Sequence, residues 1–200
     1  MHAEGFVLAG GQSSRMGRDK ALVELAGRPL IEWALAGLHG AGLTARIAGA
    51  KADLSAFAPV VPDETADAGP LAGVCAALHA TAAEWAVVLP VDLPLIPASL
   101  IRFLIDDASM TGAPVTAPSL NGFAQTFPSV VRREALPALQ AELEVGRSGV
   151  FAAFRSLNVR VVPVELAPVR DERAWPAYRW FWNVNTPEDL AKVESALRAG

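Results

Sequence analysis

Residues 5–20 read GFVLAGGQSSRMGRDK, an apolar run that leads into a glycine-rich loop with three basic side chains. The apolar run predicts a buried strand, and the glycines let the backbone N–H groups approach phosphate oxygens closely. Arg15 offers a planar fork to two oxygens, whereas Lys20 offers a compact point charge. We interpret the loop as a cradle for the phosphates of a nucleotide triphosphate, with an ordinary Gly/Ser-rich turn as the alternative.

The spacing within this loop excludes two common nucleotide fingerprints. It contains neither Gly-x-x-x-x-Gly-Lys-Ser/Thr nor Gly-x-Gly-x-x-Gly. The sequence therefore argues against both a P-loop and a dinucleotide-binding site.

The composition predicts a compact domain with a substantial core. The chain has 200 residues, of which 52% are hydrophobic and 19% are charged. The net charge of −4 gives no reason to expect nucleic acid or an anionic membrane as a partner. No apolar run reaches the roughly 20 residues that a bilayer crossing needs, and no signal-type segment opens the chain, so we expect a cytoplasmic protein.

Apolar strand candidates alternate with helical patterns along the chain. We expect strands at 5–9, 45–49, 60–62, 85–91 and 114–117, helices at 30–39, 70–80, 98–107, 134–144 and 187–199, and another helix that begins near Val150. Such alternation is typical of an α/β fold with a Rossmann-like, mostly parallel sheet and helices on both faces. We read 163–176, rich in proline and charge, as a connection, and 1–200 as a single domain.

A second constellation ends the strand expected at 85–91, where the sequence WAVVLPVDLP places Asp92 before Leu93-Pro94. Ligands of open α/β sheets bind outside the carboxyl ends of the strands, so Asp92 and the loop at 10–20 should face one crevice. A single carboxylate beside a triphosphate suits Mg²⁺. The alternative is an aspartate that caps the next helix.

The segment 62–73 also joins a strand end to a helix entry. Asp63 could accept hydrogen bonds from ribose hydroxyls or a base edge, and Gly69 and Gly73 would let a flat base approach the backbone. A simple turn with a helix cap explains the same residues.

Taken together, these motifs resemble the molybdenum cofactor guanylyltransferases, within the wider nucleotidyltransferases whose glycine-rich loop ends in Arg-Met-Gly-x-Asp-Lys. The resemblance runs nearly end to end, through the loop at 8–20, Asp63, the block at 69–73, the strand ending at Asp92, and the stretch NVNTPEDL at 183–190. It implies a nucleotide-diphospho-sugar transferase-like fold, with a nucleotide-binding half at about 1–110 and an acceptor half at about 111–200. In that family the stretch similar to NVNTPEDL lies by the active site.

The resemblance also implies roles for individual residues. Contacts to the guanine nucleotide fall to a set in the first half: Leu8, Ala9, Gly10, Gly11, Lys20, Asp63, Gly69 and Asp92. Lys20 would hold the phosphates, Asp92 would hold Mg²⁺, and Arg15 would help to neutralise charge. The implied reaction joins GMP from GTP to the terminal phosphate of molybdenum-molybdopterin and releases pyrophosphate. We also expect transient contacts with proteins of cofactor biosynthesis or with recipient molybdoenzymes.

The acceptor side is less determined by the resemblance. Gln125 stands in a segment where the family's proline is displaced, and Arg147 with Ser148 could bind a pterin phosphate at a helix start, with a solvated turn as the alternative. Asn183 and Asn185 could offer amides to one ligand, or they could simply end a strand before a helix capped by Thr186.

One further departure concerns the nucleotide side. At 48–51 the chain reads AGAK where the family usually has an asparagine, so a polar contact near the nucleotide is missing.

Three other functions remain open. A cytidylyltransferase for the same cofactor is one, and Gly10 speaks against it because the cytosine-specific relatives tend to have alanine there. A sugar-1-phosphate nucleotidyltransferase is the second, and a non-catalytic module that binds GTP or the cofactor is the third. The aromatic residues just before Asn183 could suggest stacking on a pterin, but we interpret them as packing.

Overall fold

The computed structural model describes residues 2–10, 19–49, 54–61, 69–147, 149–168 and 175–199. Its strands are β1 (Ala3–Leu8), β2 (Glu24–Leu25), β3 (Arg28–Pro29), β4 (Ala45–Ala48), β5 (Val60–Val61), β6 (Trp85–Pro90), β7 (Val115–Leu120), β8 (Phe123–Ala124), β9 (Ser129–Arg132) and β10 (Arg160–Pro163). Its α-helices are α1 (Leu30–Gly40), α2 (Pro70–Ala80), α3 (Ala98–Thr111), α4 (Leu136–Glu144), α5 (Val150–Ser156) and α6 (Pro187–Ala199). Short 3₁₀ turns occur at η1 (Lys20–Leu22), η2 (Arg133–Ala135), η3 (Val164–Leu166) and η4 (Ala177–Arg179).

The main sheet is mostly parallel, as the alternation predicted. Its strand order is β10-β7-β9-β6-β1-β4-β5, with β8 paired to β7. The pairs β6–β1, β1–β4, β4–β5 and β7–β10 are parallel, whereas β9 runs antiparallel to both of its neighbours. The chain moves from β1 to one side through β4 and β5, then returns to the other side at β6. The order therefore reverses between β1 and β6, and an open sheet leaves a crevice at such a point.

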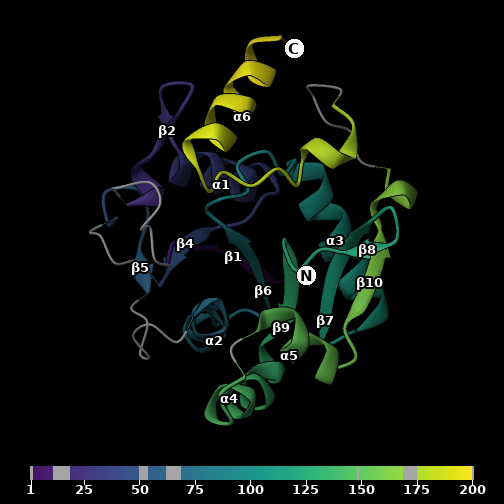
Figure 1. The fold of residues 1–200 in the computed structure, drawn as a ribbon. Helices are drawn as coiled ribbons and strands as arrows, with labels where there is room; N and C mark the ends of the chain where they lie inside the picture. Colours follow the sequence, from purple (N-terminus) through teal and green to yellow (C-terminus); the bar gives the residue numbers. More distant parts are fainter. Residues whose placement is uncertain are drawn as a thin grey trace.

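Helices cover both faces of this sheet (Figure 1). The faces alternate along the strands, so Phe6 and Leu8 of β1 pack in one hydrophobic cluster and Val7 in the other. Helices α1, α3 and α6 lie over the Val7 face, and α2, α4 and α5 lie over the Phe6 face. Because helices cover both faces of the sheet around β1, a ligand can reach these strands only at their ends.

An ion pair fastens the edge strand β10 to α3. Arg160 Nη2 lies 2.9 Å from Asp107 Oδ2, and its Nε donates to the other carboxylate oxygen. The Asp107 side chain is only 9% exposed, whereas that of Arg160 is 44% exposed. The hydrogen bond to Asp107 raises the pKa of Arg160, and the two-point contact ties helix to strand.

The structure adds strands to those we expected. β9 and β10 lie outside the predicted set, and β7 extends to Leu120. The helix predicted near Val150 is present, and Cys75 is buried in α2. No helix within the described ranges has the length and apolar character needed to cross a membrane.

Candidate active site

A cavity of about 580 Å³ opens at the carboxyl ends of β1 and β6. This volume falls in the usual range for a small-molecule site. Its lining comes from seven separate stretches of the chain: Leu8, Ala9, Gly10, Lys20, Pro70, Pro90, Val91, Asp92, Leu93, Gln125, Thr126, Phe127, Val150, Phe151, Phe181, Asn183 and Asn185. The crevice predicted from the strand order is therefore the place where the predicted motifs meet.

Backbone hydrogen bonds hold these parts together. The N–H of Val91 donates to Leu8 O at 3.0 Å, and the N–H of Ala9 donates to Ala48 O at 3.0 Å, which extends the sheet past its strand ends. The N–H of Val184 donates to Asp92 O, also at 3.0 Å. This last bond brings a segment from the C-terminal region directly against the strand end that carries Asp92.

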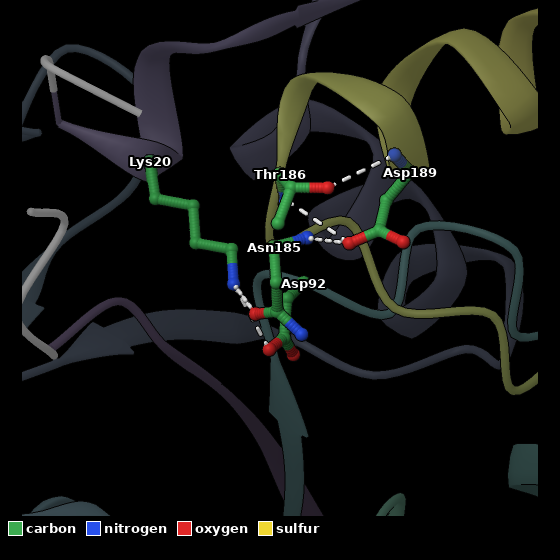
Figure 2. Close-up of polar contacts among 5 residues, drawn as sticks. All are labelled: Lys20, Asp92, Asn185, Thr186 and Asp189. Atoms are coloured by element: carbon green, nitrogen blue, oxygen red, sulfur yellow. Dashed lines mark hydrogen bonds and ion pairs between the residues drawn. The ribbon is translucent and has the colours of Figure 1, made fainter. Parts of the chain in front are cut away.

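Three polar side chains converge in the cavity (Figure 2). Lys20 Nζ lies 3.1 Å from Asp92 Oδ2 and also donates to Asn185 Oδ1. The Lys20 and Asp92 side chains are 19% and 24% exposed, so the pair is sheltered but reachable from the cavity. Asp19 shapes the turn that presents Lys20, because its Oδ1 accepts the N–H of Ala21 at 2.9 Å. In the cavity one cation, Lys20, is therefore within hydrogen-bonding distance of both an anion and an amide.

The start of α6 fixes the position of Asn185. Thr186 Oγ1 accepts the N–H of Asp189 at 3.2 Å, and Asp189 Oδ2 accepts the N–H groups of Thr186 and Asn185 at 3.0 Å each (Figure 2). This is a capping box, and it confirms the predicted cap at Thr186. The hydrogen bond from the Asn185 backbone is the main reason that the pKa of Asp189 lies below its ordinary value.

Gly10 lies where the first loop passes close to the end of β4. A Cβ at this position would stand 2.6 Å from the carbonyl oxygen of Gly49, which itself has a φ of +70°. Alanine at position 10 would therefore push against a neighbouring backbone as well as narrow the cavity.

The structure brings together most of the predicted site residues that it describes. Those that line the cavity are Leu8, Ala9, Gly10, Lys20, Asp92, Gln125, Asn183 and Asn185. Gln125 Nε2 donates to the carbonyl of Phe123 at 3.1 Å. The predictions for Gly11, Arg15, Asp63 and Ser148 fall on positions outside the described residues.

Three predicted site residues that the structure describes, Gly69, Gly73 and Arg147, do not line the cavity. Gly69 precedes Pro70 at the entry to α2 with a φ of +80°, which fits the turn and cap given as the alternative for it. Gly73 is buried in α2, where a Cβ would lie 3.1 Å from Cδ2 of the cavity residue Leu8, and Gly73 itself is not among the lining residues. Arg147, whose side chain is 66% exposed, pairs with Glu142 at 3.1 Å.

The helix-cap alternative for Asp92 is excluded. Helix α3 begins after Pro97, and no side chain caps it. The carboxylate of Asp92 instead faces Lys20 in the cavity.

Three phenylalanines in the lining escaped the sequence analysis as site residues. Phe127 precedes β9, Phe151 lies in the first turn of α5, and Phe181 belongs to the aromatic group before Asn183. In that group Trp175 and Trp180 are 7% and 6% exposed, which confirms the predicted packing role for these two. Sequence reasoning did not predict the antiparallel strand β9. This strand starts at the edge where β1 and β6 end, so it places residues 125–127 at the cavity.

The oxygen atoms of the cavity suit a hard divalent cation. Asp92 is the one carboxylate among the described lining residues, and Asn183 and Asn185 add amide groups. Within the described residues no cluster of three or more His, Cys, Asp or Glu forms a self-contained metal site. Mg²⁺ matches such a donor set, because it needs few protein ligands and takes phosphate oxygens and water for the remainder.

Comparisons with known proteins identify the family of this chain. The family model of the MobA-like NTP transferase domain matches residues 5–162. The chain is 37% identical over 196 residues to the molybdenum cofactor guanylyltransferase of Xanthomonas euvesicatoria pv. vesicatoria, covering 94% of this chain and 93% of that protein. It is 35% identical over 206 residues to the Rhodobacter capsulatus molybdenum cofactor guanylyltransferase, with 99% and 98% covered.

A solved structure shows the same fold. Molybdopterin-guanine dinucleotide biosynthesis protein A from Archaeoglobus fulgidus superposes with a TM-score of 0.81 at 24% identity, over 98% of this chain and 100% of that one. The predicted nucleotide-diphospho-sugar transferase-like fold is confirmed. The chain belongs to the MobA-like NTP transferases, within the family of the molybdenum cofactor guanylyltransferases.

Proposed function

We propose that this enzyme transfers GMP from GTP to the terminal phosphate of molybdenum-molybdopterin, forming the guanine dinucleotide of the cofactor and pyrophosphate. The observation that carries the proposal is the convergence of Lys20, Asp92 and Asn185 in one cavity at the ends of β1 and β6. The names of the relatives supply the identity of the two substrates.

The nucleotide belongs on the β1 side of the cavity in this proposal. Leu8, Ala9 and Gly10 line it there, and the ammonium of Lys20 provides a positive charge for phosphate oxygens. Gly11, Arg15, Asp63 and Gly69 complete the nucleotide-binding set that we propose. When a triphosphate binds between Lys20 and Asp92, its oxygens would replace the Asp92 carboxylate as the partner of the Lys20 ammonium.

The chemistry is an in-line displacement at phosphorus. An oxygen of the acceptor's terminal phosphate forms a bond to the α-phosphorus of GTP, and the bond from that phosphorus to the oxygen bridging to the β-phosphate breaks. Pyrophosphate leaves with the electron pair of the broken bond. The attacking phosphate is already ionised at neutral pH, so these residues contribute by positioning and charge neutralisation, as is usual for phosphoryl transfer.

Asp92 is the residue that we propose to hold Mg²⁺, with oxygens of the nucleotide phosphates and water as further ligands. When bound there, the ion would neutralise charge on the phosphates and the leaving pyrophosphate. Lys20 holds the same carboxylate in place at 3.1 Å, and Asn185 orients the lysine.

The acceptor would lie on the side of β6 and β9. Gln125, Asn183 and Asn185 line the cavity there and offer amide groups to its polar atoms. Arg147 stands outside the lining and pairs with Glu142, so a contact between Arg147 and the acceptor would require it to leave that partner.

Pyrophosphate release by the purified protein tests the proposal. The assay compares GTP, CTP, ATP and UTP in the presence of Mg²⁺, with and without molybdenum-loaded molybdopterin. We expect release that requires both GTP and the pterin. A preference for CTP would identify a cytidylyltransferase instead, and GTP binding without any turnover would identify a binding module.

A further inference from the structure

We infer that the ring of Phe151 is the surface on which the flat pterin ring of the acceptor stacks; Phe181 is a second phenylalanine in the cavity lining. The inference rests on the proposed function, since it names how the acceptor of that reaction is recognised. Both phenylalanines line the cavity, and both are partly exposed.

The topology places Phe151 at the functional edge of the sheet. β10 runs parallel to β7, and β7 has the direction of β6 because both are antiparallel to β9. Helix α5 leads back to the start of β10, so its first turn lies at the edge where β1 and β6 end. Phe151 is in that first turn, and its neighbour Val150 lines the same cavity.

The burial of the neighbouring rings separates Phe151 from structural phenylalanines. Phe154, one turn further along α5, is fully buried in the core. Phe127 and Phe181 are partly buried and pack against the hydrophobic clusters. Among the described residues, Phe151 is not one of the side chains that pack on either cluster, although it is partly buried and lines the cavity. An apolar ring that faces a cavity and does not pack in the core indicates a surface that binds a ligand.

The position of this ring favours the acceptor over the guanine base. The residues of the nucleotide side, Leu8 to Gly10, follow β1, and Gly10 adjoins Gly49 after β4. Phe127 and Phe151 come from the opposite side, from the segment before β9 and from α5. Asp92, just after β6, lies between the two groups, because β6 stands between β1 and β9 in the strand order. The reaction joins the two substrates through a phosphate near Asp92. The guanine base and the pterin ring should therefore lie on opposite sides of that phosphate.

Polar groups accompany the ring. Gln125 and Thr126 line the cavity beside Phe127. Amide and hydroxyl groups there can meet the hydrogen-bonding edge of a pterin, while an aromatic ring meets its face.

Substitution of Phe151 tests the inference by two independent readouts. One is the KM for molybdopterin and for GTP in the pyrophosphate assay, and the other is direct binding of molybdopterin without GTP, followed by quenching of its pterin fluorescence. The variants are Phe151→Ala, Phe151→Leu and Phe151→Tyr. Phe123→Ala is the matched control, because Phe123 is 75% exposed and stands outside the cavity lining.

We expect Phe151→Ala to weaken molybdopterin binding and raise its KM on the order of tenfold, the size of one lost stacking contact, with the KM for GTP unchanged. Phe151→Tyr should stay close to wild type, Phe151→Leu should lose most of the affinity, and Phe123→Ala should change neither constant. Thermal melting establishes which variants fold. If Phe151→Ala does not fold, the comparison of Phe151→Leu with Phe151→Tyr tests the stacking role instead.

Three results would overturn the inference while leaving the proposed function intact. They are an unchanged affinity for molybdopterin in Phe151→Ala, a raised KM for GTP in place of the acceptor, and a Leu variant equal to wild type. Failure of the wild type to release pyrophosphate would instead overturn the proposed function, and the binding readout would still judge Phe151.

Discussion

Two ion pairs of similar length serve different purposes in this molecule. Arg160 and Asp107 meet through two hydrogen bonds, one of 2.9 Å, and join an edge strand to a helix with the acid almost fully buried. Lys20 and Asp92 meet through one contact of 3.1 Å, join the turn η1 to the segment after β6, and face a cavity. The two hydrogen bonds between Arg160 and Asp107 suit a structural contact that stays formed. The ammonium of Lys20, shared between Asp92 and Asn185, can instead change partners and bind a ligand.

The largest effect should come from Asp92→Asn. Loss of the carboxylate removes the proposed metal ligand, and we expect turnover to fall by about 10²–10³-fold, as when one preorganised electrostatic group is lost. The melting temperature should stay near wild type, because a partly exposed lysine that loses its partner is solvated at little cost. Pyrophosphate release and thermal melting measure the two quantities. An active Asp92→Asn enzyme would place the essential charge elsewhere.

Lys20→Met should come next, with turnover reduced by about 10²-fold at unchanged stability. Lys20→Arg is the matched variant, and it should recover activity only in part because the guanidinium is planar and larger than an ammonium. The same pyrophosphate assay with GTP compares them. Full activity in Lys20→Met would show that the ion pair in the cavity is structural like the other one.

Asp107→Asn should have the opposite signature. We expect the free energy of unfolding to fall by about 1–3 kcal/mol, the range for a lost hydrogen bond to a charged group, with turnover of the folded enzyme unchanged. Urea unfolding provides the first number and the pyrophosphate assay the second. A variant with normal stability and impaired turnover would remove the distinction between the two pairs.

The smallest effect concerns the support of Asn185. Asp189→Asn should lower the free energy of unfolding by about 1 kcal/mol at pH 7, as for a lost helix cap. Because folding lowers the pKa of Asp189, its contribution is complete above the ordinary carboxyl pKa and is lost as the pH falls through the folded value. The gap between wild type and variant in urea unfolding should therefore narrow toward low pH. A gap that widens toward low pH would contradict the assignment.

Much of this architecture could be predicted from local sequence, and the exceptions have a common cause. Apolar runs and helix starts gave the strands β1, β4 and β6 and most of the helices, because such signals are local. Strands β9 and β10, four residues each, were missed, since short strands depend on partners that are distant in sequence.

The site divides in the same way. The rule for strand ends correctly brought Gly10 and Lys20, at the two ends of the first loop, into one cavity with Asp92. It could not supply the contact between Lys20 and Asn185, which are 165 residues apart, because that contact depends on where α6 begins. Phe151 was missed for a related reason, since a phenylalanine at the start of a helix does not show whether it faces the core or a cavity.

The close passage of Gly10 and Gly49 has an evolutionary consequence. With a Cβ at position 10 only 2.6 Å from the carbonyl of Gly49, the two positions cannot drift independently. A lineage that acquires alanine at position 10 must also re-route the turn after β4, so the fitness effect of either change depends on the other.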